Sequence, residues 1–572
     1  MTCNVFTSVE ENRLRSLLFV VALAAAAPPS STSAATPASR GDIANYAEHQ
    51  LLANYSPDGP GAAVIIARGD EVLFRGARGK ADVEHGMPLS ADSGFDIGSI
   101  TKQFAAAGLL KLAEAGKVSL DDPLSKFVKD YPQGDKITIR ELLNHTSGIK
   151  SYTDAHDPAR NGLTTMQLVD SFKNDKPEFE PGAGWAYDNS GYVLVGAVIE
   201  AVSGMPWPRY LTQTLFEPLH LDHTGYGADP AVVARQAHGY TVSQGKALPA
   251  PLESRSHPHA DGSLVSTVDD LLKWNRALHT GRVLESESYR QMITPVGMAV
   301  PEQYGFGVWH TTLHHHEMIG HSGHISGFSA YLLYLPETDI SVAVLQNMDR
   351  APGVVDPGET ARKFAAFALG EPYAAPKPIV LGAAALNEAE GIYGIDPAGP
   401  RYGSKQGARV LRVIAGTLTV AQTGGTRSDL MPIATDTFQS KDSFDRLRLE
   451  RSDAGGVVAV RLFPDGEGAG QLLARAGDRA VPSSSGMPSR AALERFAGTY
   501  LADGLALRVF LERDQLKAEL AGQPPVALVA ESPSTFLVAE VDATVEFAPQ
   551  EGVPLTATLH QGNETIVAKR QP

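Results

Sequence analysis

One sequence pattern occurs twice in the last third of the chain, and this repeat limits the folds that the chain can adopt. The two copies share four residues at the same spacing: Ala385, Leu386, Gly391 and Tyr393 in the first, and Ala492, Leu493, Gly498 and Tyr500 in the second. Both continue with a Leu-x-Val and a Leu-x7-Phe pattern. Short alternating apolar runs such as Val457 to Leu462 are typical of antiparallel strands. We therefore expect two small antiparallel β-barrels of about 85 to 100 residues each.

Two proline-rich segments, 371–378 and 482–488, delimit the repeated units. Their composition is typical of linkers. They predict a large first domain over residues 41–372, a barrel over 380–480 and a second barrel over 489–572. A chain of 572 residues is too long for one hydrophobic core, and this division accounts for its length.

The N-terminal segment has the pattern of a secretory leader. Arg13 and Arg15 precede an apolar run over 17–27, and small residues follow that run. The run is about half of the ~20 residues needed to span a bilayer, so we expect no integral membrane span after cleavage. We predict a signal peptide over residues 1–27 and a secreted or periplasmic protein. A frayed N-terminal helix is the alternative, because acidic residues are unusual in a basic leader.

Composition excludes several classes of protein. The net charge of -16 opposes a broad electrostatic surface for nucleic acid or anionic lipid. Cys3 is the only cysteine, so an internal disulfide and a thiolate metal cluster are impossible. A glycine-rich phosphate loop ending in Gly-Lys-Ser/Thr is absent from the sequence. We expect no cofactor and no nucleic-acid partner.

The first domain begins and ends with strand patterns that enclose a helical middle. Strands are expected over 62–67 and 71–75, and again over 329–335 and 339–345. Helical patterns cover 99–115, 190–202 and 267–278, with a further helix from Leu142 that the pair Thr138 and Glu141 would cap. This order predicts an α+β fold.

Ser99 and Lys102 stand three residues apart at the start of a helical run, so their side chains face the same side. A serine needs a base to become nucleophilic, and a partly desolvated lysine can lose its proton at neutral pH. The helix N-terminus would add partial positive charge beside a developing oxyanion. The spacing alone is weak, because chance produces it often in a long chain and a solvated helix pair would look the same.

Two further peptides strengthen the hypothesis of a catalytic site. Tyr187 and Asn189 follow a Pro-Gly-rich turn and precede a helix, and His321-Ser322-Gly323 precedes a strand pair. With Ser-x-x-Lys, the chain thus resembles the serine penicillin-recognising superfamily, whose third element is Lys-Thr-Gly or its His-x-Gly variant. Class C β-lactamases, DD-carboxypeptidases, D-aminopeptidases and related esterases belong to this superfamily. The resemblance covers about residues 42–370 and includes the peptides 142–148, 262–267 and 304–307.

The resemblance implies a β-lactamase/transpeptidase-like domain, in which an antiparallel sheet is flanked by helices and joined by a helical subdomain. It also implies a role for each matched residue. Ser99 would form an acyl-enzyme, with Lys102 as its proton acceptor. Tyr187 would relay protons, and Asn189 would hold Lys102 and the substrate. The backbone N–H groups of Ser99 and His324 would form the oxyanion hole, and Ser322 and Gly323 would lie along the substrate. Sequence does not settle which of Lys102 and Tyr187 is the resting base.

His321 departs from the lysine found at this position in β-lactamases. A histidine is mostly neutral at pH 7, so a fixed positive charge for a substrate carboxylate is missing. Such a charge would contribute on the order of 4 kcal/mol at 4 Å and an effective dielectric of 20. We expect weaker binding of β-lactams and D-Ala-D-Ala termini, and activity on carboxylate-bearing substrates that rises as the pH falls toward 6.

Histidines crowd the segment before the expected late strands: His310, His314, His315, His316, His321 and His324. His316 and His321 are five residues apart, whereas the His-Glu-x-x-His zinc motif places them four apart on a helix. The flanking runs also have strand patterns. We expect no catalytic metal, and instead a solvated loop or an adventitious site.

The leading hypothesis is a secreted serine hydrolase that cleaves an amide or ester of a small-molecule or short-peptide substrate. A penicillin-recognising domain followed by two lipocalin-like barrels is similar to the D-aminopeptidase arrangement, in which the barrels restrict access to the site. The alternative is a catalytically idle sensor or binding protein in which the barrels perform the recognition. The oligomeric state is left open by the sequence.

Overall fold

The computed structural model describes residues 36–571 with several gaps. The larger gaps are 155–161, 244–245, 251–258, 350–353, 395–407 and 478–489, and the shorter ones, all in the barrels, are 424, 426, 442, 467, 469, 503–504, 513–514, 521–524, 550–552 and 563. The expected signal peptide over 1–27 lies outside the described residues. Among the described helices, none is long and apolar enough to cross a membrane.

A six-stranded antiparallel sheet forms the centre of the first domain, in the order β10-β11-β12-β13-β1-β2. Its strands come from both ends of the domain: β1 (Ala62–Arg68), β2 (Glu71–Arg78), β10 (Trp309–Leu313), β11 (His316–Ile325), β12 (Phe328–Leu335) and β13 (Ile340–Gln346). Strand β1 pairs with β13 from Ala62 opposite Gln346 to Arg68 opposite Ile340. The early and late strand patterns therefore meet in one sheet, which confirms the expected α+β class.

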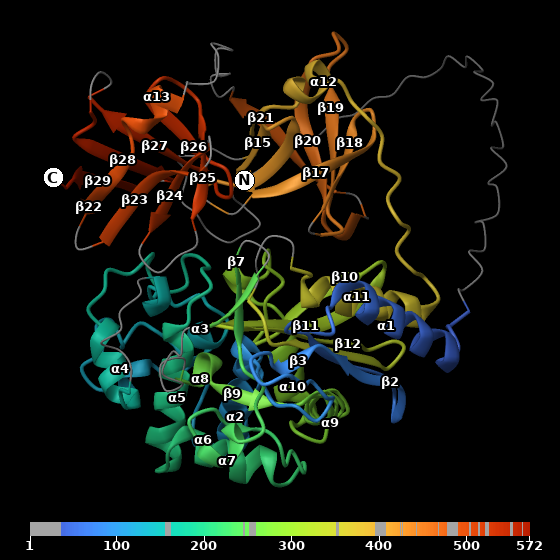
Figure 1. The fold of residues 1–572 in the computed structure, drawn as a ribbon. Helices are drawn as coiled ribbons and strands as arrows, with labels where there is room; N and C mark the ends of the chain where they lie inside the picture. Colours follow the sequence, from blue (N-terminus) through green and yellow to red (C-terminus); the bar gives the residue numbers. More distant parts are fainter. Residues whose placement is uncertain are drawn as a thin grey trace, which may run out of the picture. The chain divides into compact units, whose positions relative to one another are not determined.

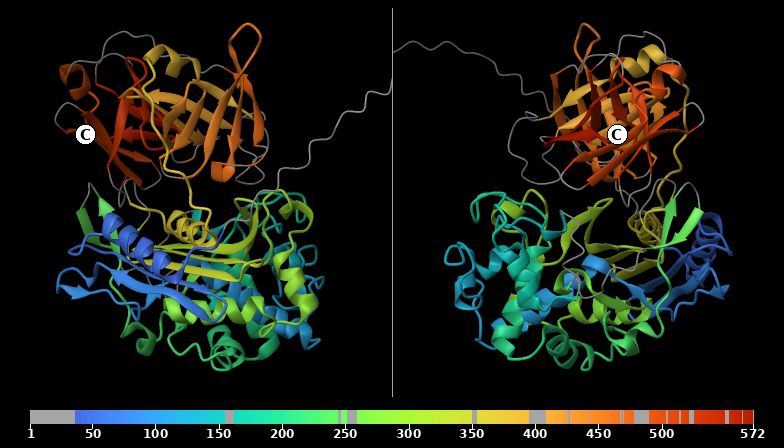
Figure 2. Two further views of the ribbon diagram at one scale, coloured as in Figure 1. Left: turned by 90° about the vertical axis from the view of Figure 1, so that its right-hand side faces the viewer. Right: turned by 60° about the vertical axis from the view of Figure 1, so that its left-hand side comes forward.

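Helices cover both faces of the sheet, because the side chains of its strands alternate between two hydrophobic cores (Figure 2). Val64 and Ile66 of β1 pack against α1 (Arg40–Asn54) and α11 (Pro357–Leu369). Ile65 faces the opposite core, which contains residues of α2 (Thr101–Glu114) and α9 (Val268–His279). Small strands lie beside this layer: β3 (Lys80–Asp82), β4 (Met87–Pro88), β5 (Phe95–Asp96), β6 (Gly225–Tyr226), β7 (Tyr240–Ser243), β8 (Lys246–Pro249) and β9 (Leu264–Ser266).

The helical part of the domain is built around α5 (Ser190–Ser203), whose residues 190–199 are all buried. It packs against α2 and several shorter helices. Those helices and the remaining ones of the domain are α3 (Ile139–Leu143), α4 (Thr165–Phe172), α6 (Trp207–Leu211), α7 (Pro230–Val233), α8 (His259–Gly262) and α10 (Ser286–Ile293). The predicted capping box starts α3: Glu141 N–H donates to Thr138 Oγ1 at 3.3 Å, and a Glu141 carboxylate oxygen accepts from Thr138 N–H at 2.8 Å.

Two closed eight-stranded antiparallel barrels follow, orange and red in Figure 1, and confirm the architecture predicted from the repeat. The first contains α12 (Ala383–Glu388), β14 (Gly391–Tyr393), β15 (Arg409–Ile414), β16 (Thr417–Gln422), β17 (Arg427–Ala434), β18 (Thr437–Ser440), β19 (Arg446–Arg451), β20 (Val457–Phe463) and β21 (Gln471–Gly477). The second contains α13 (Arg490–Glu494), β22 (Gly498–Ala502), β23 (Leu505–Glu512), β24 (Gln515–Leu520), β25 (Val526–Ala530), β26 (Thr535–Val538), β27 (Ala543–Ala548), β28 (Thr556–Gln561) and β29 (Glu564–Arg570).

The repeated tyrosine has the same physical role in both barrels. Tyr393 and Tyr500 are completely buried. The Tyr393 hydroxyl donates to the Ala389 carbonyl at 2.8 Å, and the Tyr500 hydroxyl donates to the Phe496 carbonyl at 2.9 Å. Each phenol thus ties the first strand of its barrel to the turn after the preceding helix, which explains why the spacing recurs.

Candidate active site

Ser99 and Lys102 lie where a short 3-10 turn, η1 (Gly98–Ile100), runs into helix α2. The Lys102 ammonium group donates to Ser99 Oγ at 3.3 Å, to Asn189 Oδ1 at 2.7 Å and to the Asp261 carbonyl oxygen at 2.8 Å. Lys102 is completely buried, whereas Ser99 remains partly exposed. The two residues paired by sequence spacing are therefore neighbours, and the serine is the less buried of the two.

Tyr187 and Asn189 belong to the turn that leads into α5. The Asn189 side chain makes no helix-capping bond. Instead it accepts from Lys102 and donates to Thr153 Oγ1 at 2.9 Å. The Tyr187 ring centroid lies 4.9 Å from Lys102 Nζ, and its buried hydroxyl has no hydrogen-bond partner within the described part of the chain. The structure thus brings all four predicted side chains together.

Strand β11 lies directly against the turn that carries Ser99, because glycine occupies both sides of the contact. Gly98 has a φ of +50°, and a Cβ there would lie 2.6 Å from the His324 backbone nitrogen. A Cβ on Gly323 would lie only 1.9 Å from the Ile97 carbonyl oxygen. The backbones of Ser99 and His324, the two predicted oxyanion donors, therefore belong to adjoining segments. Ser322 and Gly323 lie on the same strand, and the His324 side chain is exposed.

His321 is buried, and both of its ring nitrogens have partners inside the protein. Nδ1 lies 2.5 Å from the Ser322 carbonyl oxygen and Nε2 lies 3.1 Å from the Tyr304 hydroxyl. A carbonyl only accepts, so Nδ1 carries the proton and Nε2 accepts from Tyr304. Burial, with a smaller contribution from the nearby Lys102 charge, lowers the pKa of His321 to about 3. Protonation of His321 therefore gives no basis for the expected rise toward pH 6 in activity on carboxylate-bearing substrates.

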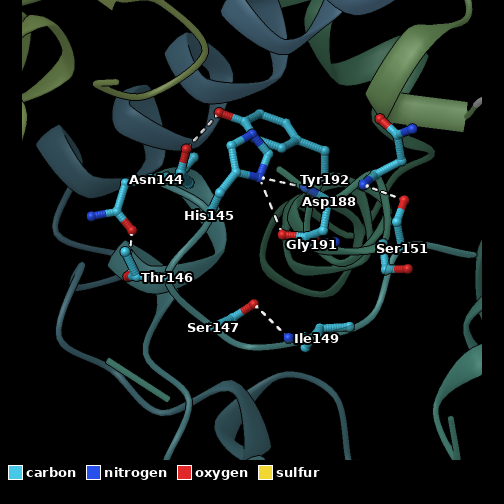
Figure 3. A network of polar contacts seen from close by, with 12 residues as sticks. Asn144, His145, Thr146, Ser147, Ile149, Ser151, Asp188, Gly191 and Tyr192 are labelled. Carbon is cyan, nitrogen blue, oxygen red and sulfur yellow. Dashed lines mark hydrogen bonds and ion pairs between the residues drawn. The ribbon is translucent and has the colours of Figure 1, made fainter. Parts of the chain in front are cut away.

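A buried pair, His145 and Asp188, supports the site and was not assigned a role from sequence (Figure 3). The Asp188 N–H donates to His145 Nδ1 at 3.2 Å, and Asp188 Oδ2 lies 3.1 Å from the same nitrogen. The other oxygen of Asp188 accepts from the Gly191 N–H at the start of α5. The His145 ring lies 4.4 Å from the Tyr187 ring, and burial lowers the pKa of His145. The only signals in the sequence were the peptide 142–148 and the position of Asp188 between Tyr187 and Asn189.

Asp261 is a second buried acid beside the site that sequence reasoning missed. Its carbonyl oxygen accepts from Lys102, and its carboxylate accepts from the Tyr152 hydroxyl at 3.2 Å. Burial raises the pKa of Asp261 to about 7, although the Lys102 charge acts in the opposite direction. Asp261 directly precedes the peptide 262–267, which is part of the resemblance to the superfamily. Nothing in the spacing of Asp261 pointed to a contact with Lys102.

Several aromatic rings lie close to Tyr187. Trp309 lies nearly parallel to Tyr187, with ring centroids 6.1 Å apart, and 4.3 Å from the His321 ring. Trp185 and Tyr304 complete a small buried cluster behind these residues. Tyr187 and Trp309 are themselves partly exposed. The surroundings of the site are therefore apolar and aromatic, and they lack the lysine of the β-lactamase motif.

Four histidines of the histidine-rich segment come before His321, on β10 and at the turn into β11. His310 lies on β10, where its Nε2 is 2.7 Å from Glu317 Oε1, and His314 and His315 form the turn between β10 and β11. His316 begins β11, five residues before His321. At about 3.4 Å per residue these two positions are about 17 Å apart along the strand. His316 is therefore far from His321 along β11.

The fold and the arrangement of the site are those of a β-lactamase-like domain. The Beta-lactamase family matches residues 47–366, more than half of the chain. The chain belongs to this family.

Two curated relatives match about half of the chain. Penicillin-binding protein 4* of Bacillus subtilis is 30% identical over 295 residues, which are 47% of this chain and 64% of that protein. Protein flp of Staphylococcus aureus is 26% identical over 321 residues, which are 54% of this chain and 63% of that protein. The chain thus spans slightly less than two thirds of the length of these relatives.

Two solved structures share the fold. The octameric penicillin-binding protein homologue from Pyrococcus abyssi aligns with a TM-score of 0.53 and 25% identity, over 76% of this chain and 99% of that chain. The D-amino acid amidase from Ochrobactrum anthropi SV3, complexed with L-phenylalanine amide, aligns with a TM-score of 0.51 and 25% identity, over 58% of this chain and 97% of that chain.

Proposed function

We propose that the protein is a serine hydrolase that forms an acyl-enzyme on Ser99 and cleaves an amide or ester of a small substrate or short peptide. The observation that carries this proposal is the position of the Lys102 ammonium group, bound at once to Ser99 Oγ and Asn189 Oδ1. A lysine held in this way can take the serine proton when it is unprotonated, and the buried surroundings exclude water from the transfer.

The reaction follows from this geometry. Ser99 Oγ attacks the substrate carbonyl carbon while its proton passes to Lys102, directly or through Tyr187. The carbonyl oxygen becomes an oxyanion that the backbone N–H groups of Ser99 and His324 stabilise, and one such donor typically contributes ~2.7 to 4 kcal/mol to lowering the barrier. The proton then passes to the leaving amine or alcohol as its bond to carbon breaks. Water then attacks the ester carbon and gives its proton to Lys102, directly or through Tyr187. The bond from carbon to Ser99 Oγ breaks, the proton returns to Ser99, and the acid leaves.

The substrate class follows from the charges around the site. His321 is neutral and its ring nitrogens are both occupied, so it supplies no cation for a carboxylate beside the scissile bond. Substrates without such a carboxylate are favoured: D-aminoacyl amides, N-terminal D-residues and simple esters. The likeness to a D-amino acid amidase and the aromatic surroundings of Tyr187 support this class. β-Lactams and D-Ala-D-Ala termini would bind less well.

We further propose a secreted or periplasmic location and a D-aminopeptidase-like arrangement in which the barrels restrict access to small substrates. The location rests on the leader pattern over 1–27. The domain boundaries rest on the two proline-rich segments. Mass spectrometry of the mature N-terminus, after expression with the native leader, tests the cleavage after Ala27.

A parallel substrate screen tests the activity. D-aminoacyl anilides, short-chain esters and a chromogenic cephalosporin would be compared on the native protein and on Ser99→Ala. We expect turnover of an anilide or ester that Ser99→Ala abolishes. A native protein that hydrolyses none of them and shows no burst of product would favour the idle sensor or binding protein instead.

A further inference from the structure

A cluster of metal-ligating side chains lies at the turn between β10 and β11, outside the catalytic group. His315 and His316 come from this hairpin, and Glu371 directly follows the glycine that ends α11. His316 Nε2 lies 3.5 Å from Glu371 Oε1, and His315 Nδ1 lies 3.9 Å from Glu371 Oε2. One ligand atom from each residue lies within 4.8 Å of the other two. We name this group the hairpin cluster.

One separation in the hairpin cluster is that of two ligands around one small cation. Zinc binds imidazole nitrogen and carboxylate oxygen at about 2.0 to 2.2 Å in tetrahedral geometry, which places two ligand atoms about 3.4 Å apart. The 3.5 Å between His316 and Glu371 matches this value and is long for a charge-assisted hydrogen bond. The His315 side chain is 74% exposed, so it has room to rotate toward the other two ligands.

A second carboxylate holds His316 from the other side. Glu337 Oε2 lies 2.9 Å from His316 Nδ1, while Nε2 faces Glu371. A neutral imidazole has a single N–H and cannot donate to both carboxylates. With a cation on Nε2, the Nδ1–H donates to Glu337, which is the carboxylate–histidine–metal arrangement that orients metal-bound histidines. The His316 side chain is only 14% exposed, so its orientation is fixed.

Glu371 is also fixed in place. Its backbone carbonyl lies 2.8 Å from His314 Nε2, and its backbone N–H donates to the Ala366 carbonyl at the end of α11. The carboxylate therefore projects toward the hairpin from an anchored backbone. Because 371–378 is the first proline-rich segment, a cation here would join the hairpin to the start of that linker.

We propose that His315, His316 and Glu371 bind one Zn²⁺ ion, with water as the fourth ligand. Two imidazoles and one carboxylate favour zinc over magnesium or calcium, which prefer sets of oxygen ligands. The ion is structural: it ties the β10–β11 hairpin to residue 371, about 17 Å along β11 from His321. The proposal is independent of the reaction at Ser99.

Calorimetric titration of Zn²⁺ into the chelator-treated full-length protein tests the proposal. We expect one saturable site, weakened at least tenfold by His316→Gln and by Glu371→Gln. Glu337→Gln is expected to weaken it about 10- to 100-fold through the lost orientation of His316. Two matched controls are expected to bind Zn²⁺ as tightly as the native protein. His310→Gln removes a histidine that is paired to a single glutamate. His238→Gln disrupts a separate group made of Asp82, Glu84 and His238.

Thermal unfolding without metal separates loss of binding from loss of folding. A variant that unfolds as the native protein does, yet binds Zn²⁺ at least tenfold more weakly, supports the site. Should either ligand variant fail to fold, cleavage of the 371–378 linker by a protease gives a second measurement, because Zn²⁺ is expected to slow it in the native protein and in His238→Gln. Three results would overturn the proposal. Zn²⁺ binding could survive both ligand substitutions, or it could be lost in His238→Gln. The native protein could also bind Zn²⁺ only weakly and without saturation, which would mean an adventitious ion only.

Discussion

Lys102 occupies the centre of the site because three separate segments provide the acceptors for its ammonium group: η1, the turn before α5, and α8. We predict that Lys102→Arg lowers kcat about 10²- to 10⁴-fold, because an arginine keeps the charge but cannot accept the serine proton. Hydrolysis of a neutral ester is the measurement. Lys111→Arg, on the same helix at a partly buried ion pair with Glu114 outside the site, serves as the control. An arginine variant at position 102 that retained a tenth of the native activity would argue against the proton-acceptor role.

His321 leads to a prediction about pH. Burial lowers the pKa of this residue to about 3, so its charge does not change between pH 7.5 and 5.5. The ratio of kcat/KM for a carboxylate-bearing substrate to that for a matched neutral ester is therefore expected to stay constant over this range. A ratio that rises severalfold as the pH falls, and does so in native protein but not in His321→Gln, would show that His321 gains a proton after all.

At the scale of elements, the contact between β11 and the Ser99 turn is set by the absence of side chains. Gly323→Ala places a Cβ 1.9 Å from the Ile97 carbonyl oxygen, so the strand has to move away from η1. We predict a loss of kcat of about 10²- to 10³-fold, the size typical of a lost oxyanion donor. Gly477→Ala, where a Cβ meets no atom within 4 Å, is the control. Full activity in the Gly323 variant would show that the position of β11 does not matter for the oxyanion hole.

The two barrels share a buried ion pair between Arg427 at the start of β17 and Asp542 just before β27, 2.9 Å apart and with side chains 2% and 1% exposed. Arg427 N–H also donates to the Glu540 carbonyl. Removing one partner of a buried pair leaves the other charge uncompensated, typically at a cost of about 3 to 5 kcal/mol. We predict that Asp542→Asn lowers the free energy of unfolding of the barrels by this amount, measured in denaturant. Asp429→Asn, at an exposed pair with Lys441, should change it by less than about 1 kcal/mol.

For the whole molecule, buried histidines control the stability in mild acid. Burial lowers the pKa of His259 to about 4 and that of His279 and His321 to about 3, whereas an unfolded histidine titrates near 6.5. Their stabilisation is complete above pH 6.5 and is lost as the pH falls toward 3 to 4. Asp261, with its pKa raised to about 7, is protonated in the folded state but not in the unfolded state between pH 7 and 4. Its release of a proton on unfolding cancels one of the three protons that the histidines take up. Unfolding should thus take up at least two protons over the middle of that range, because the lowered pKa of His145 adds to the uptake, and this corresponds to at least about 3 kcal/mol per pH unit.

The melting temperature, measured from pH 7 to pH 4.5, tests this linkage. We expect the melting temperature to fall as the pH is lowered. It is expected to fall less steeply in His279→Asn, because unfolding of this variant takes up about one proton fewer. His49→Asn, at an exposed position on α1, should follow the native curve. A native curve that is flat or rises toward pH 4.5 would contradict the assignment of buried neutral histidines.

Much of this organisation could be predicted from sequence because it depends on local periodicity. The strands expected over 62–67 and 329–335 are found at Ala62–Arg68 and Phe328–Leu335, and the repeat gives two closed barrels. The helix expected from Ser99 begins at Thr101, because Gly98 at positive φ starts a 3-10 turn first. His145, Asp188 and Asp261 could not be assigned roles, since they meet the site only through the packing of α3, α5 and α8. The neutral state of His321 likewise depends on burial that a motif does not reveal.

The central claim is that Ser99 is the nucleophile, activated by its contact with Lys102. A fluorophosphonate probe that reacts covalently with activated serines tests it most directly, with intact-protein and peptide mass spectrometry as the measurement. The account predicts one adduct per chain on the peptide containing Ser99, none in Ser99→Ala, and strongly slowed labelling in Lys102→Arg. Labelling that persists at the native rate in Ser99→Ala would contradict it.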